Sequence, residues 1–138
     1  MNNERERRLD ELDERAAYEF LAEQLARLSA EEEYEFRHED YVMEMPQSCE
    51  RIRGRDNMLA FQQAYPENAQ SPTVRLRRVL VRDGLWVAEG VSDYGGRIYN
   101  VVDIIELRDG SICRETRYYA DPFEAPAWRT EWVERFNN

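Results

Sequence analysis

Apolar residues in the first half of the chain recur at the spacing of a helix. Over residues 16–28 they fall three and four positions apart, which predicts a helix with one face on a core. Over residues 29–36 a serine is followed three positions later by a glutamate, a capping-box pattern that predicts a second, shorter helix. Helical spacing returns over residues 56–65, and Pro66 ends that pattern.

The second half of the chain has runs rich in Val, Ile, Tyr and Thr, separated by turn residues. Four such runs predict the strands of an antiparallel meander, namely residues 73–82, 85–93, 97–108 and 112–121. The turns between them contain glycine, at Asp83-Gly84, Tyr94-Gly95-Gly96 and Asp109-Gly110. A short strand over residues 40–45 precedes the meander and runs into a loop at Pro46.

The order of these elements indicates the fold class. Helices come first and the meander follows, which predicts an α+β domain with one curved antiparallel sheet and helices on one face, not a parallel Rossmann sheet. Residues 68–72 are interpreted as a linker. After the meander, apolar residues at helical spacing predict a short helix that packs on the core as a lid, and these residues are Trp128, Trp132, Val133 and Phe136.

The chain divides into a charged arm and one domain. Residues 1–15 are almost all charged, with Leu9 and Leu12 as the only apolar side chains after Met1, so frayed helix or disorder is expected there. A length of 138 residues supports one core but not two. Residues 16–138 are therefore expected to form a single domain.

Composition argues against several classes of function. A net charge of −10 and a pI near 4.7 argue against nucleic acid and anionic membranes as partners. No apolar run approaches the ~20 residues that span a bilayer, and the N-terminus is unlike a signal peptide, so we expect a soluble, cytoplasmic protein. Two cysteines and one histidine, His38, make neither a disulfide framework nor a zinc cluster, and no nucleotide-binding glycine loop is present. No metal and no cofactor are expected.

One carboxylate interrupts the most apolar predicted strand. Asp103 stands between Val102 and Ile104. A carboxylate desolvated by apolar neighbours has a raised pKa unless something pairs with it, and such groups often mark functional sites. The alternative is a strand aspartate that faces water or forms a structural ion pair.

The residues beside Asp103 depend on the turn at Asp109-Gly110. A two-residue turn pairs Asp103 with Thr116, whereas a three-residue loop that begins at Arg108 pairs it with Glu115. The three-residue loop is favoured, because it places an arginine one diagonal step from the carboxylate. It puts Glu115, Arg117 and Tyr119 on the same face as Val101, Asp103 and Ile105.

This face predicts a mostly apolar cavity with a few polar groups, the usual form of a small-molecule site. The polar groups are Asp103, Arg117 and Tyr119, and the other expected lining residues are Tyr18, Met43, Met45, Trp86, Tyr99, Val101, Ile105 and Glu115. Two chemistries remain open. A protonated Asp103 would act as a general acid while Arg117 or Tyr119 polarises an oxygen. If Arg117 pairs with both carboxylates, Asp103 stays ionised and is a base or a salt-bridge partner.

Four strings of residues resemble one known family. They are Glu44-Met45-Pro46, Ile52-Arg53-Gly54-Arg55-Asp56, Val102-Asp103-Ile104-Ile105-Glu106-Leu107-Arg108-Asp109-Gly110 and Arg117-Tyr118-Tyr119-Ala120-Asp121-Pro122-Phe123. With the order of elements, they resemble the SnoaL-like branch of the nuclear transport factor 2-like (NTF2-like) superfamily over about residues 16–136. The resemblance implies an α+β cone, a concave sheet around a hydrophobic pocket closed by helices, and often a homodimer through the outer face of the sheet.

The resemblance also implies roles for two residues. Asp103 falls where ketosteroid isomerases keep a protonated aspartic acid for the developing oxyanion, and where SnoaL-like cyclases keep an acid/base aspartate. The proton-shuttling base of the isomerases corresponds to Met45, which cannot take a proton. The leading hypothesis is a cofactor-independent isomerase, cyclase or lyase that acts by acid–base chemistry on a small hydrophobic carbonyl compound, with Asp103, Arg117 and Tyr119 as catalytic residues. The alternatives are a non-catalytic protein that binds a small hydrophobic ligand and a dimeric protein-interaction module.

Overall fold

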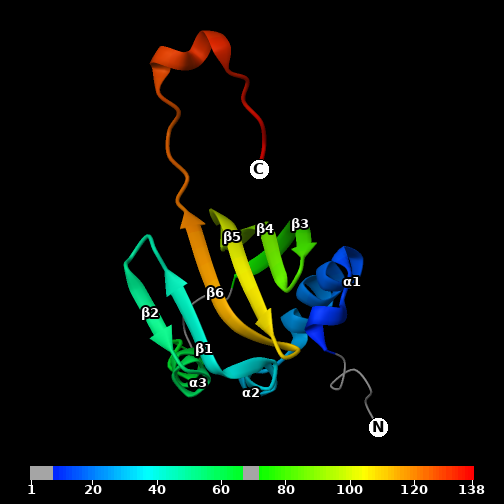
Figure 1. Ribbon diagram of the computed structural model, residues 1–138. Coiled ribbons are helices and arrows are strands. Elements are labelled where there is room, and N and C mark those ends of the chain that lie inside the picture. The colour runs from blue at the N-terminus through cyan, green and yellow to red at the C-terminus, as the bar shows by residue number, and fades with distance from the viewer. Residues whose placement is uncertain (1–7, 67–71) are drawn as a thin grey trace.

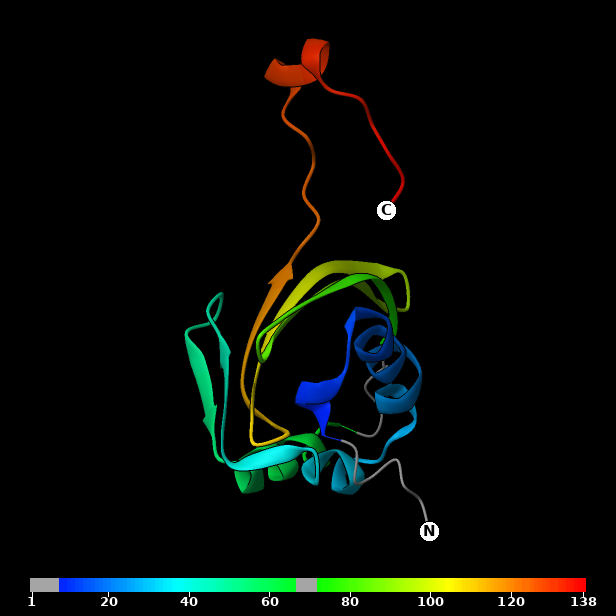
Figure 2. The same ribbon diagram turned by 45° about the vertical axis from the view of Figure 1, so that its right-hand side comes forward.

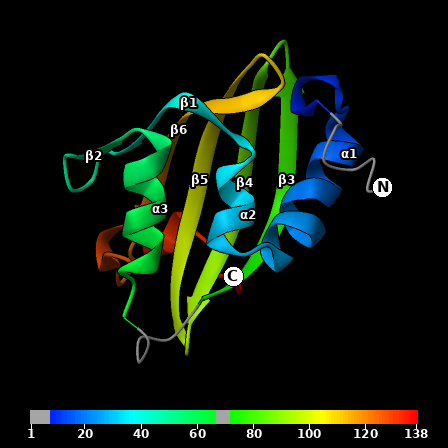
Figure 3. The ribbon, with the colours of Figure 1, turned by 90° about the horizontal axis from the view of Figure 1, so that it is seen from below.

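A strongly curved sheet forms the body of the protein, and the helices lie against its concave face (Figures 1, 2 and 3). The computed structural model describes residues 8–66 and 72–138. The strands of this part, in chain order, are β1 (Arg37–Met45), β2 (Glu50–Arg53), β3 (Thr73–Arg82), β4 (Leu85–Tyr94), β5 (Arg97–Arg108) and β6 (Ser111–Ala120). Across the sheet their order is β2-β1-β6-β5-β4-β3. The α+β cone expected from the sequence is confirmed.

Strands β3 to β6 form the predicted antiparallel meander, and their ends agree with the expected ends to within one residue. Two details differ. Strand β1 pairs with β6 in parallel, with Met43 opposite Glu115, so the sheet is mixed. Strand β2 was expected to be loop, because Glu50–Arg53 carries a single apolar residue, Ile52, and four residues are too few to show an alternating pattern.

The three helical segments predicted before the meander are present. The predicted helix over residues 16–28 corresponds to α1 (Glu14–Glu19), which begins two residues earlier, a π turn η3 (Phe20–Gln24) and a 3-10 turn η4 (Leu25–Arg27). The capping box at Ser29 is confirmed as the start of α2 (Ala30–Tyr34), and α3 covers Arg55–Gln63. In the described part of the chain, no helix has the length and apolar character needed to cross a membrane.

The core lies between the concave face of the sheet and these helices (Figure 2). Phe20 packs edge-on against Phe36 and Trp86, with ring centroids 5.1 and 6.1 Å apart. The buried apolar residues of this core are Leu9, Leu12, Ala17, Phe20, Tyr41, Met43, Met58, Val79, Trp86, Ala88, Ile105 and Ile112. One core of this kind is what stabilises a domain of this size.

The start of the described chain also belongs to the core. Leu9 and Leu12 are 2% and 6% exposed, and the 3-10 turn η2 (Leu9–Glu11) is tied to the β5–β6 turn by the Leu9 N–H, which donates to the Gly110 carbonyl at 3.1 Å. A frayed or disordered arm was expected here, because two leucines among many charges form no helical stripe. Residues 1–7 of that predicted arm, and residues 68–71 of the predicted linker, lie outside the described residues.

The predicted C-terminal lid is wrong. The residues form a 3-10 turn, η5 (Ala127–Trp132), that rises away from the sheet beyond the end of β6 (Figures 1 and 2). Trp128 and Trp132 are each 76% exposed, and Phe136 is 79% exposed. Helical spacing shows which side chains share a face, but it does not show what that face covers.

Candidate functional site

The β5–β6 hairpin sets the position of the candidate site. Asp109 and Gly110 have φ values of 53° and 79° and form a two-residue turn, which pairs Arg108 with Ser111. The register then shifts by one residue, which leaves Cys113 as the extra residue of a β-bulge. Turn and bulge together fix which side chains of β6 meet Asp103.

Asp103 lies directly opposite Arg117. Both partners expected for it, Thr116 and Glu115, are therefore wrong. The two-residue turn alone would have placed Thr116 there, and the bulge moves the register on by one further residue. With this extra residue, the partner of Asp103 lies two residues from the one that the favoured three-residue loop would give. Side chains two residues apart lie on the same face, so Glu115, Arg117 and Tyr119 share the face of Asp103, as predicted.

Small residues of β4 lie beside the site. Ala88 is opposite Asp103, and Gly90 is opposite Val101. A Cβ at Gly90 would lie 2.7 Å from the Arg75 carbonyl oxygen, so this position admits only glycine without a backbone shift. On the same face of β4, Trp86 is opposite Ile105 and Ser92 is opposite Tyr99. The predicted face of the meander is confirmed.

A chain of buried polar contacts connects Asp103 to β1. Arg117 Nη2 donates to Glu115 Oε2 at 2.6 Å, and the Tyr41 hydroxyl donates to the same oxygen at 2.6 Å. Tyr41 and Glu115 are 0% and 4% exposed. Arg117 Nε lies 3.7 Å from Asp103 Oδ2, too far for a hydrogen bond. Arg117 is therefore bound by Glu115 and only loosely paired with Asp103.

Two polar atoms of the site lack partners. Asp103 Oδ1 and Arg117 Nε are buried and have no hydrogen-bond partner among the described residues. The Asp103 side chain as a whole is 21% exposed, so its accessible area lies on atoms other than Oδ1. A buried acceptor and a buried donor without hydrogen bonds lower the stability of the fold, and groups of this kind often belong to functional sites.

The charges of the site follow from these contacts. Burial, and then the nearby Glu115 carboxylate, raise the pKa of Asp103 well above its usual range, against the opposing effect of Arg117. Burial would also raise the pKa of Glu115, but Arg117 and the hydrogen bond from Tyr41 bring it below its usual range. Burial disfavours a charged Arg117, yet Glu115 and Asp103 raise its pKa well above the usual value. The site favours an ionic pair of Arg117 and Glu115 beside a protonated Asp103.

Tyrosines lie beyond Asp103, toward the ends of β5 and β6. Tyr119 is opposite Val101, and Tyr99 packs edge-on against Tyr94 with ring centroids 5.5 Å apart. Burial, and then the neighbouring Tyr119, raise the pKa of Tyr94. Sequence reasoning included Tyr99 and Tyr119 but missed Tyr94 and Tyr41. The alternation in residues 40–45, which places Tyr41 with Met43, was the available signal for Tyr41.

The other predicted lining residues lie at different depths. Met43, Trp86 and Ile105 are each 1% exposed and pack in the core, and Met45 at the end of β1 packs against that core while half-buried. Tyr18 is 37% exposed on α1, and its hydroxyl donates to the Leu76 carbonyl of β3 at 3.2 Å. Tyr18 is thus held at the edge strand and does not contact the polar chain at Asp103.

A separate cleft opens where η2 meets the first helical segment. Its lining residues are Leu9, Leu12, Ala16, Glu19, Phe20, Gln24 and Phe36. None of these is a candidate site residue. The cleft therefore lies at the end of the core near the β5–β6 turn, whereas Asp103 and Arg117 lie farther along those strands.

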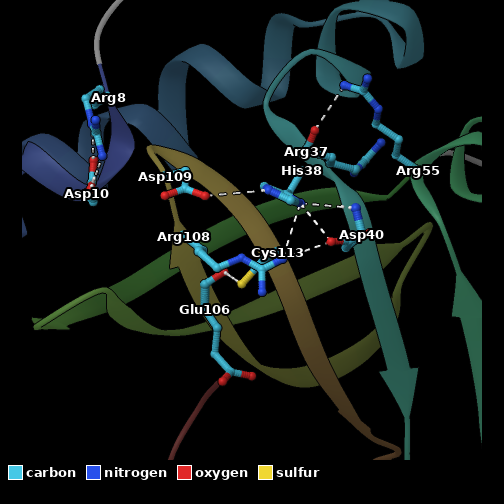
Figure 4. A network of polar contacts seen from close by, with 10 residues as sticks. All are labelled: Arg8, Asp10, Arg37, His38, Asp40, Arg55, Glu106, Arg108, Asp109 and Cys113. Carbon is cyan, nitrogen blue, oxygen red and sulfur yellow. Dashed lines mark hydrogen bonds and ion pairs between the residues drawn. The ribbon is translucent and has the colours of Figure 1, made fainter.

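His38 belongs to a polar cluster at the β5–β6 turn (Figure 4). Its Nδ1 accepts the Asp40 backbone N–H at 3.1 Å and lies 3.4 Å from Arg108 Nη2, and its Nε2 lies 3.8 Å from Asp109 Oδ2. The Cys113 thiol in the same view donates to the Glu106 carbonyl at 3.3 Å. These contacts connect β1 to the hairpin turn. In the described ranges, no group of three or more His, Cys, Asp and Glu side chains is placed to hold a metal ion.

Comparison with known proteins gives a family match and similar structures. The family model described as the SnoaL-like domain matches residues 15–115. No curated protein matches the chain. A solved NTF2-like protein of unknown function from Burkholderia xenovorans is 36% identical, with a TM-score of 0.65, and the match covers 78% of this chain and 83% of that one.

Two further solved structures carry names that refer to chemistry. A protein from Kribbella flavida, provisionally described as a ketosteroid isomerase, is 27% identical with a TM-score of 0.74, over 98% of this chain and 92% of that one. A protein from a Jannaschia species, provisionally described as a SnoaL-like polyketide cyclase, is 14% identical with a TM-score of 0.55, over 65% and 71% of the two chains. The second likeness shows the fold alone.

Proposed function

Because the chain belongs to the SnoaL-like domain family, we propose that it is a cofactor-independent enzyme that performs acid–base chemistry on a small hydrophobic carbonyl compound. Isomerase, cyclase and lyase reactions all fit this description. The observation that supports the proposal is the buried Asp103 Oδ1, which has no hydrogen-bond partner among the described residues and stands beside an arginine already neutralised by Glu115. The name of the similar protein from Kribbella is consistent with such chemistry.

Protonated Asp103 supplies the acid in this proposal. It donates a hydrogen bond to the carbonyl oxygen of the substrate, and this bond strengthens as the oxygen gains negative charge. The unpartnered Arg117 Nε is the second donor to that oxygen. Tyr119 follows Arg117 by two residues along β6 and therefore lies on the same face, where it orients the substrate at the edge of the site. Met45 cannot accept a proton, so in this proposal the proton that the substrate loses passes to a water molecule bound with the substrate.

A binding protein without turnover is the second candidate. It is favoured by Met45, which stands where a ketosteroid isomerase keeps its proton-shuttling base. In this case the same two unpartnered atoms bind the oxygen of a hydrophobic ligand, and nothing is converted. The resemblance also implies a homodimer, which stays a prediction here.

A panel of small hydrophobic ketones and enones distinguishes the two candidates. Each compound is incubated with wild type and with Asp103→Asn, and both product formation and the shift in melting temperature are measured. Turnover by wild type that falls by about 100-fold or more in Asp103→Asn supports the enzyme, since general acid catalysis typically contributes that much. A thermal shift without product from any compound supports the binding protein. Loss of turnover in Tyr18→Phe but not in Asp103→Asn would overturn the assignment of the acid.

A further inference from the structure

Arg37 is a buried arginine at the start of β1, with 6% of its surface exposed. Its Nη2 donates to Glu33 Oε2 on α2 at 3.1 Å, and its Nη1 donates to Gln62 Oε1 on α3 at 3.0 Å. The side-chain amide of Gln62 also donates to Glu33, so the three side chains form a closed ring of contacts. A buried charge needs partners of this kind. Arg37 therefore connects two helices to the strand that carries Tyr41.

The guanidinium group of Arg37 also faces the ring of Tyr41, four residues later on β1. The Arg37 Cζ lies 5.2 Å from the centre of that ring, within the range of a cation–π contact. Both side chains are buried, so water screens the contact little. The Tyr41 hydroxyl donates to Glu115 Oε2 at 2.6 Å. Because the ring of a tyrosine is rigid, a contact that holds the ring also sets the direction of its hydroxyl.

The backbone leaves this task to side chains. The pairing of β1 with β6 is irregular between Arg37 and Val42, and Tyr41 lies in that stretch. A regular ladder therefore does not set how Tyr41 approaches β6. The position of Arg37 is fixed by a further contact, because Arg55 Nη1 donates to the Arg37 carbonyl at 3.2 Å (Figure 4).

The contact of Tyr41 with Glu115 affects Asp103, because two carboxyl groups share one arginine. Arg117 lies 2.6 Å from Glu115 and 3.7 Å from Asp103. Burial raises the pKa of Glu115, but Arg117, the Tyr41 hydroxyl and Arg37 lower it. Carboxyl groups this close compete for a proton, so a contact that favours ionised Glu115 leaves the proton on Asp103.

We propose that Arg37 is a positioning residue of the Asp103 site. It holds the ring of Tyr41 so that the hydroxyl reaches Glu115, and Arg117 then stays bound to Glu115 and not to Asp103. Through Glu33 and Gln62, the same contacts make the site depend on the packing of α2 and α3 against β1. This arrangement of contacts is independent of the proposed function, whereas its effect on catalysis rests on that function.

Two NMR measurements on the full-length chain test this role. One follows the Tyr41 hydroxyl proton, whose exchange with water is slowed by the short, buried hydrogen bond to Glu115. The other follows the carboxyl carbon of Asp103, labelled with carbon-13, as the pH changes. Arg37→Gln/Glu33→Gln removes both charges of the ion pair together. It should speed the hydroxyl exchange at least about tenfold and lower the midpoint of the Asp103 titration by about one pH unit or more.

Arg55→Gln is the matched control. Arg55 also joins a helix to β1, and its guanidinium group also lies over a tyrosine ring, that of Tyr34, at 4.3 Å from the ring centre. Its loss should lower the stability of the fold and leave both NMR signals as in wild type. If Arg37→Gln/Glu33→Gln does the same, Arg37 is a structural tie alone and the proposal is overturned.

Two further variants separate the route of the effect from a general loss of structure. Arg37→Lys keeps the charge but loses the planar fork, and it should move both signals in the same direction as the double variant. Where the double variant does not fold, this variant decides. Tyr41→Phe should lower the midpoint of the Asp103 titration as well. An unchanged midpoint in Tyr41→Phe would overturn the route through the hydroxyl.

The effect on catalysis is measured separately. On a ketone or enone that wild type converts, Arg37→Gln/Glu33→Gln should lower kcat at neutral pH and change KM little. The loss should shrink at lower pH, where Asp103 regains its proton. If wild type converts none of the compounds while both NMR signals change as expected, the proposed function fails and the positioning role of Arg37 stands.

Discussion

Asp103 is a carboxyl group whose Oδ1 atom is buried and has no hydrogen-bond partner among the described residues. Its raised folded pKa means that the folded state holds the proton more tightly than the unfolded chain does. The stability this group contributes is fully present below the unfolded pKa and is lost as pH rises through the folded value. Wild type is therefore expected to lose stability between about pH 5 and about pH 8 relative to Asp103→Leu, which has no proton to release.

The measurement is urea unfolding of both proteins at the two pH values. Asp103→Leu should be more stable than wild type at the higher pH by about 1–3 kcal/mol, the cost of a buried polar group left unsatisfied. The difference should narrow at the lower pH, where Asp103 is protonated in wild type. A variant that is less stable than wild type at both values would show that Asp103 is a structural partner of Arg117 instead.

Tyr41, after Arg117, favours the ionised form of Glu115 and lowers the pKa of that carboxyl. Tyr41→Phe keeps the ring and removes the hydroxyl that donates to Glu115 at 2.6 Å. Because that acceptor is an ionised, buried carboxylate, the variant is expected to lose about 1.5–3 kcal/mol of unfolding free energy at neutral pH. Glu115 has a lowered folded pKa, so its contribution is lost as pH falls, and the difference between variant and wild type should shrink in acid. Tyr118→Phe, at a tyrosine that is 43% exposed, is the matched control and should change the unfolding free energy little.

At the scale of elements, the β5–β6 hairpin shows what a sequence can and cannot specify. Asp109-Gly110 predicts a turn, because few other pairs accept two positive φ values, and the runs beside it predict strands. The bulge at Cys113 has no local signal, so the partner of Asp103 could not be derived. The predicted face is nevertheless correct. Side chains alternate with a period of two, and the observed partner, Arg117, lies two residues from the expected partner, Glu115, so both lie on the same face.

Other parts of the site depend on contacts between distant segments. Tyr41 reaches Glu115, 74 residues later in the chain, because β1 pairs with β6 in parallel. A parallel pairing between strands so far apart in the chain leaves no turn signal in the sequence. The aromatic residues of the C-terminal segment were predicted to form a lid on the core. Helical periodicity shows which side chains share a face, but it does not identify the surface that this face contacts. The sequence thus predicts the Asp103, Arg117 and Glu115 face, but not the tyrosine that completes it.

The η2 turn gives an element-scale prediction. Leu9 and Leu12 are buried, although the residues around them are charged. Leu9→Ala and Leu12→Ala should each lower the unfolding free energy by about 2–4 kcal/mol, as truncation of buried leucines does. Leu85→Ala, at a leucine that is 38% exposed, should cost much less and serves as the control. Equal, small effects of all three changes in urea unfolding would show that residues 8–12 detach from the core in solution.

At the scale of the whole molecule, the homodimer that the family resemblance implies would couple stability to protein concentration. If a folded dimer unfolds to two separate chains, mass action raises the melting temperature as the concentration increases. Wild type is therefore expected to melt at a higher temperature at about 100 μM than at about 1 μM chain, whereas Leu80→Ser/Tyr118→Ser, which makes the outer face of the sheet polar, should melt at the same temperature at both. Both side chains are at least 43% exposed within one chain, so their loss has little effect on the stability of a monomer. A wild type whose melting temperature is independent of concentration would mean that the chain stays monomeric over this range, and the outer face of the sheet would then lie in water.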